Sequence, residues 1–223
     1  MKKWKRAPIY FLSNKLFGQP LEPSLLPSFR EKILPMTQNQ VGLDLGCGNG
    51  YYLSYFSKNS IGIDIDRKCI KNCRKINLSA IGANLNNNPK KLPLKNSFFD
   101  FIFLSHILEH LKSPNEILVQ SKEWLKPKGR VFVGLPTYYN VLRLLGDDYF
   151  QHHPGHIHIF KLEVAKKIIK QSGYSIEKVF WDPVLIRFQS KSSYKIFYSI
   201  FQKLPPWIKS YFSLGFWIIA KSD

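Results

Sequence analysis

Residues 41–50 read Val-Gly-Leu-Asp-Leu-Gly-Cys-Gly-Asn-Gly, and this stretch decides the fold. Its apolar start is typical of a short buried strand, which breaks into glycines at alternate positions and then into an aromatic-rich segment. Glycine takes positive φ without steric penalty, so the main chain can approach a ligand closely. The free N–H groups of a helix expected at 51–58 would point into the same crevice. The stretch therefore predicts a strand, a glycine turn and a helix that bind a nucleotide-like ligand.

Asp44 narrows the class of ligand. A dinucleotide-binding loop reads Gly-x-Gly-x-x-Gly, would have its third glycine where this chain has Tyr51, and must receive a pyrophosphate. Here the loop is Gly-x-Gly-x-Gly, and a carboxylate lies two residues before Gly46. That carboxylate would repel a phosphate but suits a ligand that carries an ammonium group. The sequence therefore predicts a nucleoside-like ligand that is partly cationic.

Strands and helices alternate after the loop. Three apolar runs predict further strands, at 60–64, 80–85 and 98–105. A basic segment at 67–77 predicts a helix, and the alternation favours a mostly parallel sheet whose ligands bind at the carboxyl ends of the strands. Asp64 ends the second strand, 20 residues after Asp44, where an acidic side chain can accept hydrogen bonds from both ribose hydroxyls.

Four motif blocks follow one another at characteristic spacing. They are Leu-Asp-Leu-Gly-Cys-Gly-Asn-Gly at 43–50, Gly-Ile-Asp at 62–64, Leu-Pro-Leu through Ser-Phe-Phe-Asp at 92–100, and Ile-Leu-Glu-His-Leu at 107–111 followed by Trp-Leu-Lys-Pro-Lys-Gly-Arg at 124–130. Together the blocks resemble the class I S-adenosylmethionine-dependent methyltransferases, within their small-molecule-type group, from about residue 38 to 182. The resemblance implies an α/β fold: a Rossmann-like, seven-stranded, mostly parallel sheet with helices on both faces and an antiparallel last strand.

The resemblance also implies a set of cofactor contacts. In the family, the carboxylate matching Asp44 lies near the methionine ammonium of S-adenosylmethionine, the glycine loop approaches the cofactor, and the acid matching Asp64 holds the ribose hydroxyls. The residue matching Asn84 contacts the adenine amino group, and the main chain at Leu85 contacts the adenine ring. The cofactor-binding residues expected here are Asp44, Gly46, Cys47, Gly48, Gly50, Asp64, Ile65, Asn84, Leu85 and Ser105.

Asn84 departs from the family pattern, because most members have Asp at this position. The amide oxygen of Asn84 can still accept a hydrogen bond, but it brings no charge. Two interpretations stay open: adenine is bound with less affinity, or Asn84 simply begins a turn.

The acceptor is expected beside Ser105 and His106, immediately after the fourth strand, where this family places residues between cofactor and substrate. The alternative is that His106 opens a helix at 107–111 and packs locally. We interpret Glu109 and His110 as structural, because their apolar neighbours form a packing face. The catalytic residue is not identified by sequence, and His106 and His156 are the candidates for a general base.

Missing motifs argue against two kinds of acceptor. No Asp/Asn-Pro-Pro-Tyr/Phe loop follows the fourth strand, which argues against methylation of an exocyclic base amine. No cysteine follows Cys73, so the chain lacks the thiolate nucleophile that a cytosine C5 enzyme requires. The acceptor atoms that remain are an oxygen, an amine nitrogen or an activated carbon. We predict that this atom belongs to a small-molecule or lipid-like acceptor.

Residues 136–160 are expected to form a substrate lid. The residues predicted to face the substrate are His106, Tyr138, Tyr139, His156 and His158. Histidines are frequent enough in this segment to suggest a metal site. We predict no metal, however, because the family commonly has a His-x-x-x-Phe-like segment, matched by 156–160, without one.

The two ends of the chain carry further patterns. Residues 1–40 are punctuated by prolines and predict a strap with a short helix near 27–34. A helix at 162–172, a strand at 175–181 and an antiparallel strand at 216–220 are also expected. Residues 190–213 predict a pair of amphipathic, basic, aromatic helices. These helices could lie on an anionic membrane, clamp a greasy substrate, or pack on the sheet.

Composition sets the broad class. The 223 residues, of which 44% are hydrophobic, suffice for a single methyltransferase domain over 1–223. The net charge of +18 suits RNA or an anionic membrane surface as partner, or reflects the scattered lysines of an AT-rich genome. Three cysteines are read as free thiols and, with no export signal and no apolar run of membrane-spanning length, indicate a cytoplasmic protein, peripheral to a membrane if the tail binds one. The alternatives to a small-molecule enzyme are an RNA methyltransferase and a cofactor-binding module without catalysis; the oligomeric state is not readable from sequence.

Overall fold

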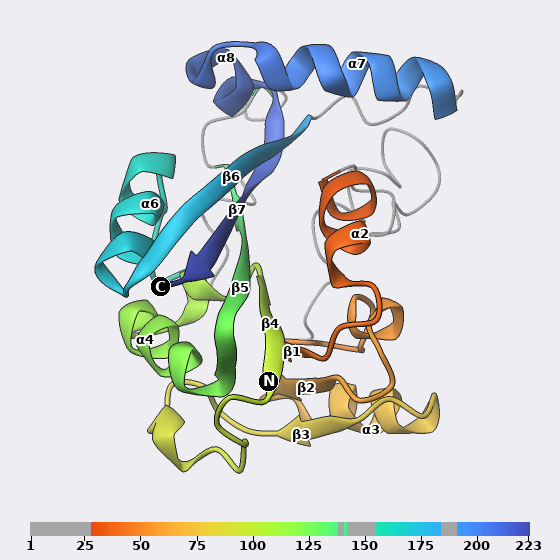
Figure 1. Cartoon of the computed structure of the whole chain (residues 1–223), viewed down its shortest axis with the longest axis vertical. Coiled ribbons are helices and arrows are strands. Elements are labelled where there is room, and N and C mark those ends of the chain that lie inside the picture. Colours follow the sequence, from red (N-terminus) through yellow and green to blue (C-terminus); the bar gives the residue numbers. More distant parts are fainter. Residues whose placement is uncertain (1–27, 138–140, 142–154, 184–190) are drawn as a thin grey trace.

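The protein is described by a computed structural model that covers residues 28–137, 141, 155–183 and 191–223, without the side chains of 191–195. Seven strands form one sheet in the order β3-β2-β1-β4-β5-β7-β6 (Figure 1). The strands are β1 (Gly42–Leu45), β2 (Ile61–Asp64), β3 (Ala80–Gly82), β4 (Phe99–Ser105), β5 (Leu125–Pro136), β6 (Tyr174–Pro183) and β7 (Ser213–Ser222). Pairings among β1 to β5 are parallel, and β7 runs antiparallel to β5 and β6. The predicted mostly parallel sheet with an antiparallel last strand is confirmed.

Helices cover both faces of this sheet, as predicted. The helices are a π-helical turn (Phe29–Ile33) that continues into α2 (Leu34–Thr37), α3 (Arg67–Lys75), α4 (Pro114–Trp124), α6 (Leu162–Gln171), α7 (Lys191–Lys203) and α8 (Pro206–Tyr211). Helices α4 and α6 lie together on one face, and α2 and α3 on the other (Figure 1). α7 and α8 lie across the end of the sheet at which β6 finishes.

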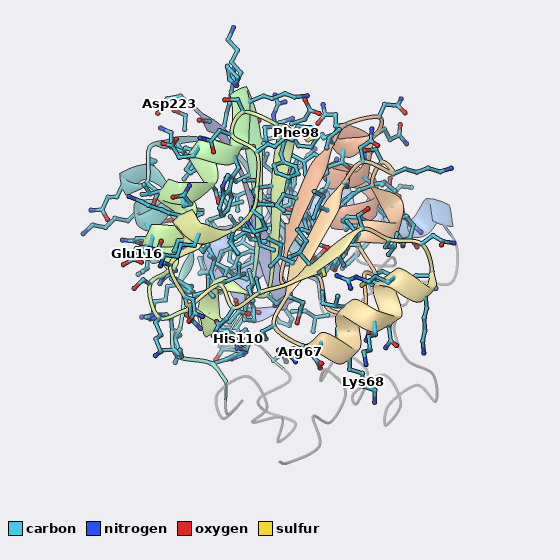
Figure 2. The ribbon with its side chains drawn as sticks, turned by 90° about the horizontal axis from the view of Figure 1, so that it is seen from below. Arg67, Lys68, Phe98, His110, Glu116 and Asp223 are labelled. Atoms are coloured by element: carbon cyan, nitrogen blue, oxygen red, sulfur yellow. The ribbon has the colours of Figure 1, made fainter. Side chains whose placement is uncertain are left out.

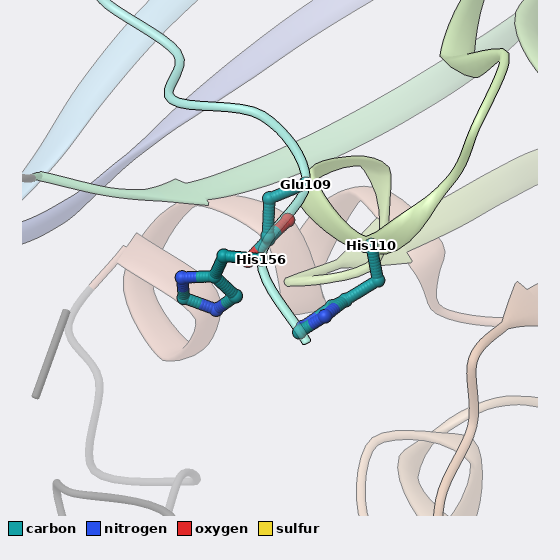
Figure 3. Close-up of side chains that lie close together, drawn as sticks. All are labelled: Glu109, His110 and His156. Atoms are coloured by element: carbon teal, nitrogen blue, oxygen red, sulfur yellow. The ribbon is translucent and has the colours of Figure 1, made fainter. Parts of the chain in front are cut away.

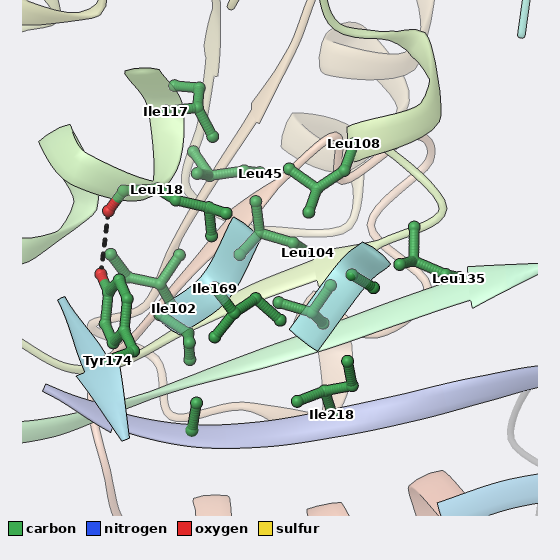
Figure 4. Packing of buried hydrophobic residues seen from close by; sticks show 14 of the residues in the cluster. Leu45, Ile102, Leu104, Leu108, Ile117, Leu118, Leu135, Ile169, Tyr174 and Ile218 are labelled. Carbon is green, nitrogen blue, oxygen red and sulfur yellow. Dashed lines mark hydrogen bonds between the residues drawn. The ribbon is translucent and has the colours of Figure 1, made fainter. Parts of the chain in front are cut away.

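Strand β4 shows how alternation builds two cores. Its residues Ile102 and Leu104 join the cluster under α4 and α6, whereas Phe101 and Phe103 point to the opposite face and join a mainly aromatic cluster. Figure 4 shows the first cluster, in which the Tyr174 hydroxyl donates a hydrogen bond to the Leu118 carbonyl at 3.0 Å. Strand β4 is thus buried on both faces in the middle of the sheet.

The aromatic cluster attaches the 28–37 segment to the sheet. Phe29 contacts Tyr52 and Phe103 with ring centroids 4.6 and 5.8 Å apart, both in edge-to-face geometry. The Ser28 main-chain N–H donates to Asp182 at 3.0 Å, and the Ser28 hydroxyl lies 2.8 Å from that of Tyr198. This part of the predicted strap is thus a helical turn packed against the sheet; residues 1–27 lie outside the described residues.

Two predicted helices are wrong. The segment expected to be helical at 51–58 contains only a 3₁₀ turn, Leu53–Tyr55, and the one expected at 107–111 contains only Leu108–His110. Aromatic residues have modest helix propensity, and here they pack sideways into the aromatic cluster before the chain turns. Leu111 is extended, and α4 begins at Pro114 after it.

Other elements match closely. Helix α6 ends before Gly173, which has φ of +81° as expected of a glycine that closes a helix. The break at Pro205 separates α7 from α8, and β3 is shorter than predicted, ending two residues before Asn84. The helix α4 was not among the predicted elements.

Candidate functional site

The parallel strands end along one edge of the sheet. Figure 2 shows Arg67, Lys68 and His110, which follow the carboxyl ends of β2 and β4, along one edge of the molecule, while Phe98, which precedes β4, lies at the opposite edge. Strand order reverses between β1 and β4, since β2 lies on one side of β1 and β4 on the other. Ligands of open α/β sheets bind at such a switch point.

The glycine loop adopts the predicted conformation at that switch point. Gly46, Gly48 and Gly50 have φ of +82°, +52° and +79°, a region that non-glycine residues rarely occupy. Apart from Gly48 and its two chain neighbours, no atom of the described residues lies within 4 Å of the position that a Cβ on Gly48 would take, so the loop faces open space within this part of the chain. The site thus has the space for a ligand to approach the main chain closely.

The amide groups of this loop are committed to the protein. The N–H groups of Gly46 and Cys47 donate to the Ile63 carbonyl at 2.7 and 3.0 Å, and the Gly48 N–H donates to Asp64 Oδ2 at 2.8 Å. The helix N-terminus that we expected after the loop is only a 3₁₀ turn. The loop is therefore not a phosphate cradle, which agrees with the cationic ligand that Asp44 predicts.

Cys47 contributes to this loop through its main chain. Its thiol is buried, and a Cβ on Gly62 would come within 2.6 Å of the sulfur. Cys47, Cys69 and Cys73 are all free, as predicted. Burial, followed by the charge of Asp44, raises the pKa of the Cys47 thiol, so it is an inert packing group.

Asp44 is the most unusual group in the site. It is 1% exposed, and its Oδ2 atom accepts no hydrogen bond from the residues that the structure describes. Burial, and to a lesser extent the charge of Asp64, raises its pKa to about 8. A buried carboxylate without a partner is costly, and the ammonium group of a ligand would supply the missing opposite charge. This residue therefore fits S-adenosylmethionine.

Asp64 is held in a fixed orientation. Its Oδ2 accepts from the Gly48 N–H and its Oδ1 accepts from the Asp66 N–H, both at 2.8 Å. Each carboxylate oxygen has a further lone pair, so the group can still accept hydrogen bonds from two hydroxyls. The next residue, Ile65, is 65% exposed, which leaves an apolar side chain beside the position expected for the nucleoside.

Asn84 begins a turn. Its Oδ1 accepts from the Asn86 N–H at 2.9 Å, and the Asn86 Oδ1 in turn accepts from the Lys112 N–H at 2.7 Å. The amide oxygen predicted to contact adenine accepts this main-chain hydrogen bond and keeps a second lone pair for the adenine amino group. Leu85 is buried behind it. Their roles in binding adenine stay predictions.

His106 lies where an acceptor is expected, directly after Ser105 at the end of β4. Its backbone is left-handed, with φ of +52°, and its N–H donates to the Gly134 carbonyl at 2.9 Å. Its Nδ1 lies 3.5 Å from Oε1 of the fully buried Glu109, and its side chain is 35% exposed. Burial alone would raise the pKa of Glu109, but His106, the main chain and His110 together hold that pKa below its usual value. Asn39, Asn77, Ser97 and Lys128 are also left-handed and are not predicted site residues, so this conformation by itself does not mark His106 as functional.

The segment at 155–158 docks on Glu109 and His110. The N–H groups of Ile157 and His158 donate to the Glu109 carbonyl at 2.8 and 3.1 Å, and the His110 ring lies 4.6 Å from that of His156. The structure therefore brings His156 to two residues that we had interpreted as structural. Tyr138 and Tyr139 lie outside the described residues, as does most of the predicted lid.

Two residues near the site were missed by sequence reasoning. Asp182, which is buried at the end of β6, accepts from the Ser28 N–H at 3.0 Å and from the Trp217 indole N–H at 2.8 Å. Tyr52 packs against Phe103. Burial, followed by the charge of Asp182, raises the pKa of the Tyr52 hydroxyl. The sequence contained a pattern that could have identified each residue, because Tyr52 follows the glycine loop and Asp182 is an acid at the carboxyl end of a strand.

A groove at the opposite edge of the sheet is not this site. Lys58, Arg74 and Phe98 are among the residues that line it. Arg74 donates there to the Ala80 carbonyl at 3.3 and 3.0 Å. None of the predicted ligand residues contributes to this groove.

The chain resembles several known proteins. Residues 21–179 match the family described as "Methyltransferase domain". The chain is 30% identical over 94 residues to an uncharacterized protein of Methanocaldococcus jannaschii, covering 42% of this chain and 43% of that protein. It is 30% identical over 146 residues to a tRNA U34 carboxymethyltransferase of Histophilus somni, covering 57% of this chain and 42% of that protein. The chain thus spans about two fifths of the length of these curated relatives.

The fold agrees with solved structures. An S-adenosylmethionine-dependent methyltransferase from Archaeoglobus fulgidus superposes with a TM-score of 0.67 at 22% identity, over 96% of this chain and 99% of that chain. A match of this identity shows the shared fold. The family match over most of the chain, the seven-stranded sheet and the loop around Asp44 agree with one another: the chain belongs to the methyltransferase-domain family and has the fold of the class I S-adenosylmethionine-dependent methyltransferases.

Proposed function

We propose that the chain transfers a methyl group from S-adenosylmethionine to an oxygen, nitrogen or activated carbon of a small-molecule or lipid-like acceptor. The observation that carries this proposal is the buried Asp44, whose Oδ2 lacks a hydrogen-bond donor within the described ranges, beside a glycine loop that faces open space. This arrangement suits a ligand that combines an ammonium group with a nucleoside.

S-adenosylmethionine supplies a methyl group on a sulfonium, whose leaving group is a neutral thioether. The protein must then align the acceptor, exclude water and, for a hydroxyl acceptor, remove a proton. With Nδ1 of His106 directed to Glu109 at 3.5 Å, its Nε2 is the atom that would accept this proton. A buried carboxylate behind the ring would stabilise the imidazolium that forms.

The lipid-like class of acceptor is supported by the outer face of α7 and α8. Ile196, Ile200 and Trp207 are 64%, 58% and 71% exposed, while Tyr198 and Phe201 form the buried face. Exposed Lys203 adds positive charge beside them. Apolar side chains next to a basic residue are typical of a helix that lies on an anionic lipid surface. Among the described residues, no helix is both long and apolar enough to cross a membrane.

RNA is the second candidate acceptor. The net charge of +18 favours a polyanion, and the relative from Histophilus somni is named for carboxymethyl transfer to tRNA. That name also describes transfer of a group other than methyl, so the group transferred by this chain needs a direct assay.

Calorimetric titration with S-adenosylmethionine tests the cofactor site. We expect binding by the wild type and a loss of at least about tenfold in affinity for Asp44→Asn and for Asp64→Asn, because each substitution removes a charge-assisted contact. Glu116→Gln, which changes an exposed carboxylate on α4, is the matched control and should bind normally. Binding that is equal in all four proteins would show that the cofactor lies elsewhere.

A labelled-methyl assay on extract fractions then tests catalysis and the class of acceptor. We expect the label to move into the organic phase and to resist ribonuclease. Label that is released by ribonuclease would favour RNA instead. Cofactor binding without labelled product in any fraction would identify a non-catalytic module.

A further inference from the structure

Three side chains that the proposed cofactor site does not use converge beside it. Glu109 and His110 belong to the 3₁₀ turn after β4, and His156 comes from the segment that docks on this turn (Figure 3). One potential ligand atom of each residue lies within 4.8 Å of those of the other two. The convergence joins residues 46 positions apart in sequence, so it is a product of the fold.

Glu109 provides an independent indication that a ligand belongs here. Its side chain is fully buried, yet neither Oε1 nor Oε2 accepts a hydrogen bond from the described part of the chain. Nδ1 of His106 lies 3.5 Å from Oε1 and forms an ion pair with it only when His106 is protonated, whereas Oε2 has no hydrogen-bond partner among the described residues. Buried carboxylates are normally hydrogen-bonded, paired or coordinated to a metal.

The tautomer of a neutral His110 ring follows from its hydrogen-bond partner. Its Nδ1 lies 2.7 Å from the Gly155 carbonyl, which can only accept a hydrogen bond, so Nδ1 carries the proton. In the neutral ring the lone pair is then on Nε2. Metal-binding histidines characteristically donate their second N–H to a carbonyl or carboxylate in this way, which fixes the ring and its tautomer.

We propose that Glu109, His110 and His156 bind a divalent transition-metal ion. Two imidazoles and one carboxylate are a common ligand set for zinc and for iron(II), and such sites leave positions open for water or a substrate oxygen. Metal–nitrogen bonds of about 2.0 to 2.1 Å place tetrahedral ligand atoms roughly 3.3 to 3.5 Å apart, so side-chain rotations must close the set. His110 and His156 are half-buried.

The location gives the site a role that goes beyond cofactor binding. Glu109 lies next to His106, which follows β4 where the acceptor is expected. A metal ion there would coordinate an acceptor oxygen and lower the pKa of an acceptor hydroxyl. This proposal differs from the prediction made from the sequence, which was no metal because the family commonly has a His-x-x-x-Phe-like segment, matched by 156–160, without one.

Cobalt(II) titration of the full chain, after dialysis against a chelator, tests this proposal without cofactor or turnover. We expect one bound equivalent with visible absorption from nitrogen and oxygen ligands. Zinc should displace the cobalt. His156→Ala and Glu109→Gln should weaken binding by about 100-fold or more, because each removes a ligand. Glu116→Gln, which changes an exposed carboxylate on α4, is the control and should bind cobalt like the wild type.

Three results would overturn the proposal. They are less than stoichiometric cobalt in the wild type, equal affinity in all four proteins, and a thiolate-to-cobalt charge-transfer band that places the ion on a cysteine. Circular dichroism and thermal unfolding of the metal-free variants distinguish a lost ligand from a misfolded chain. S-adenosylmethionine calorimetry on the same samples is independent, so the metal site can fail while the cofactor site holds.

Discussion

Asp44 is a buried acid whose expected partner is the ammonium group of a ligand. Its pKa of about 8 means that it holds a proton at neutral pH before the ligand binds. An ammonium group favours the carboxylate, so binding must release that proton. Burial disfavours the ionised form of Asp44 in the free protein, and for this reason cofactor binding depends on pH.

We therefore predict that S-adenosylmethionine binding near pH 6.5 releases about one proton, and that the release disappears near pH 9. Calorimetry in buffers of different ionisation enthalpy measures this number directly. In Asp44→Asn the residual binding should release none. Proton uptake on binding, or a release unchanged by the substitution, would contradict the role assigned to Asp44.

Single substitutions can distinguish the proposed roles of His106 and His156. As a general base for a hydroxyl acceptor, His106 should account for most of the turnover, so His106→Ala should lower kcat by about 10²- to 10⁴-fold while leaving cofactor affinity intact. His156→Ala should act instead through metal content. Unchanged turnover in both variants would remove both residues from the mechanism.

Among the helices and strands, the residue pattern correctly predicted those features that depend on neighbouring residues alone. The strand β1 and the positive φ values of Gly46 and Gly48 followed from their apolar and glycine pattern alone. The helix expected at 51–58 failed because Tyr52 and its aromatic neighbours pack into a tertiary cluster. Packing overrode a weak local preference, as it often does in short segments.

The cluster of Glu109, His110 and His156 shows what sequence reasoning could not reach. Each residue was noticed, but Glu109 and His110 were assigned to packing and His156 to a lid, because nothing local links position 109 to position 156. The link is made by main-chain hydrogen bonds from Ile157 and His158 to the Glu109 carbonyl. Only the fold reveals such a contact.

Helices α7 and α8 carry a prediction of their own. Ile200→Glu and Trp207→Glu place a charge on the exposed apolar face, and each should weaken binding to anionic vesicles by about tenfold, because each removes buried apolar area at the lipid interface. Val119→Glu is the matched control, since Val119 is 53% exposed on α4. Vesicle co-sedimentation measures the effect. Equal binding by the three variants and the wild type would exclude this face as the lipid contact.

For the molecule as a whole, two buried acids set the dependence of stability on pH. Burial raises the pKa of Asp44 to about 8 and also raises that of Asp182. In the unfolded chain Asp44 titrates near 3.8. Between these two values the native state binds a proton that the unfolded state lacks, so the free energy of unfolding falls as pH rises.

We predict that the ligand-free protein loses stability from about pH 5 to about pH 8, on the order of 1 kcal/mol per pH unit, and then levels off. Urea unfolding at a series of pH values measures this slope. Asp44→Asn should flatten it and should be more stable than the wild type at pH 8, although it binds the cofactor less tightly. Glu116→Gln should keep the wild-type slope. Saturating S-adenosylmethionine should also reduce the slope, because the bound ligand stabilises the Asp44 carboxylate. Stability that rises with pH across this window would show that Asp44 is already ionised in the free protein.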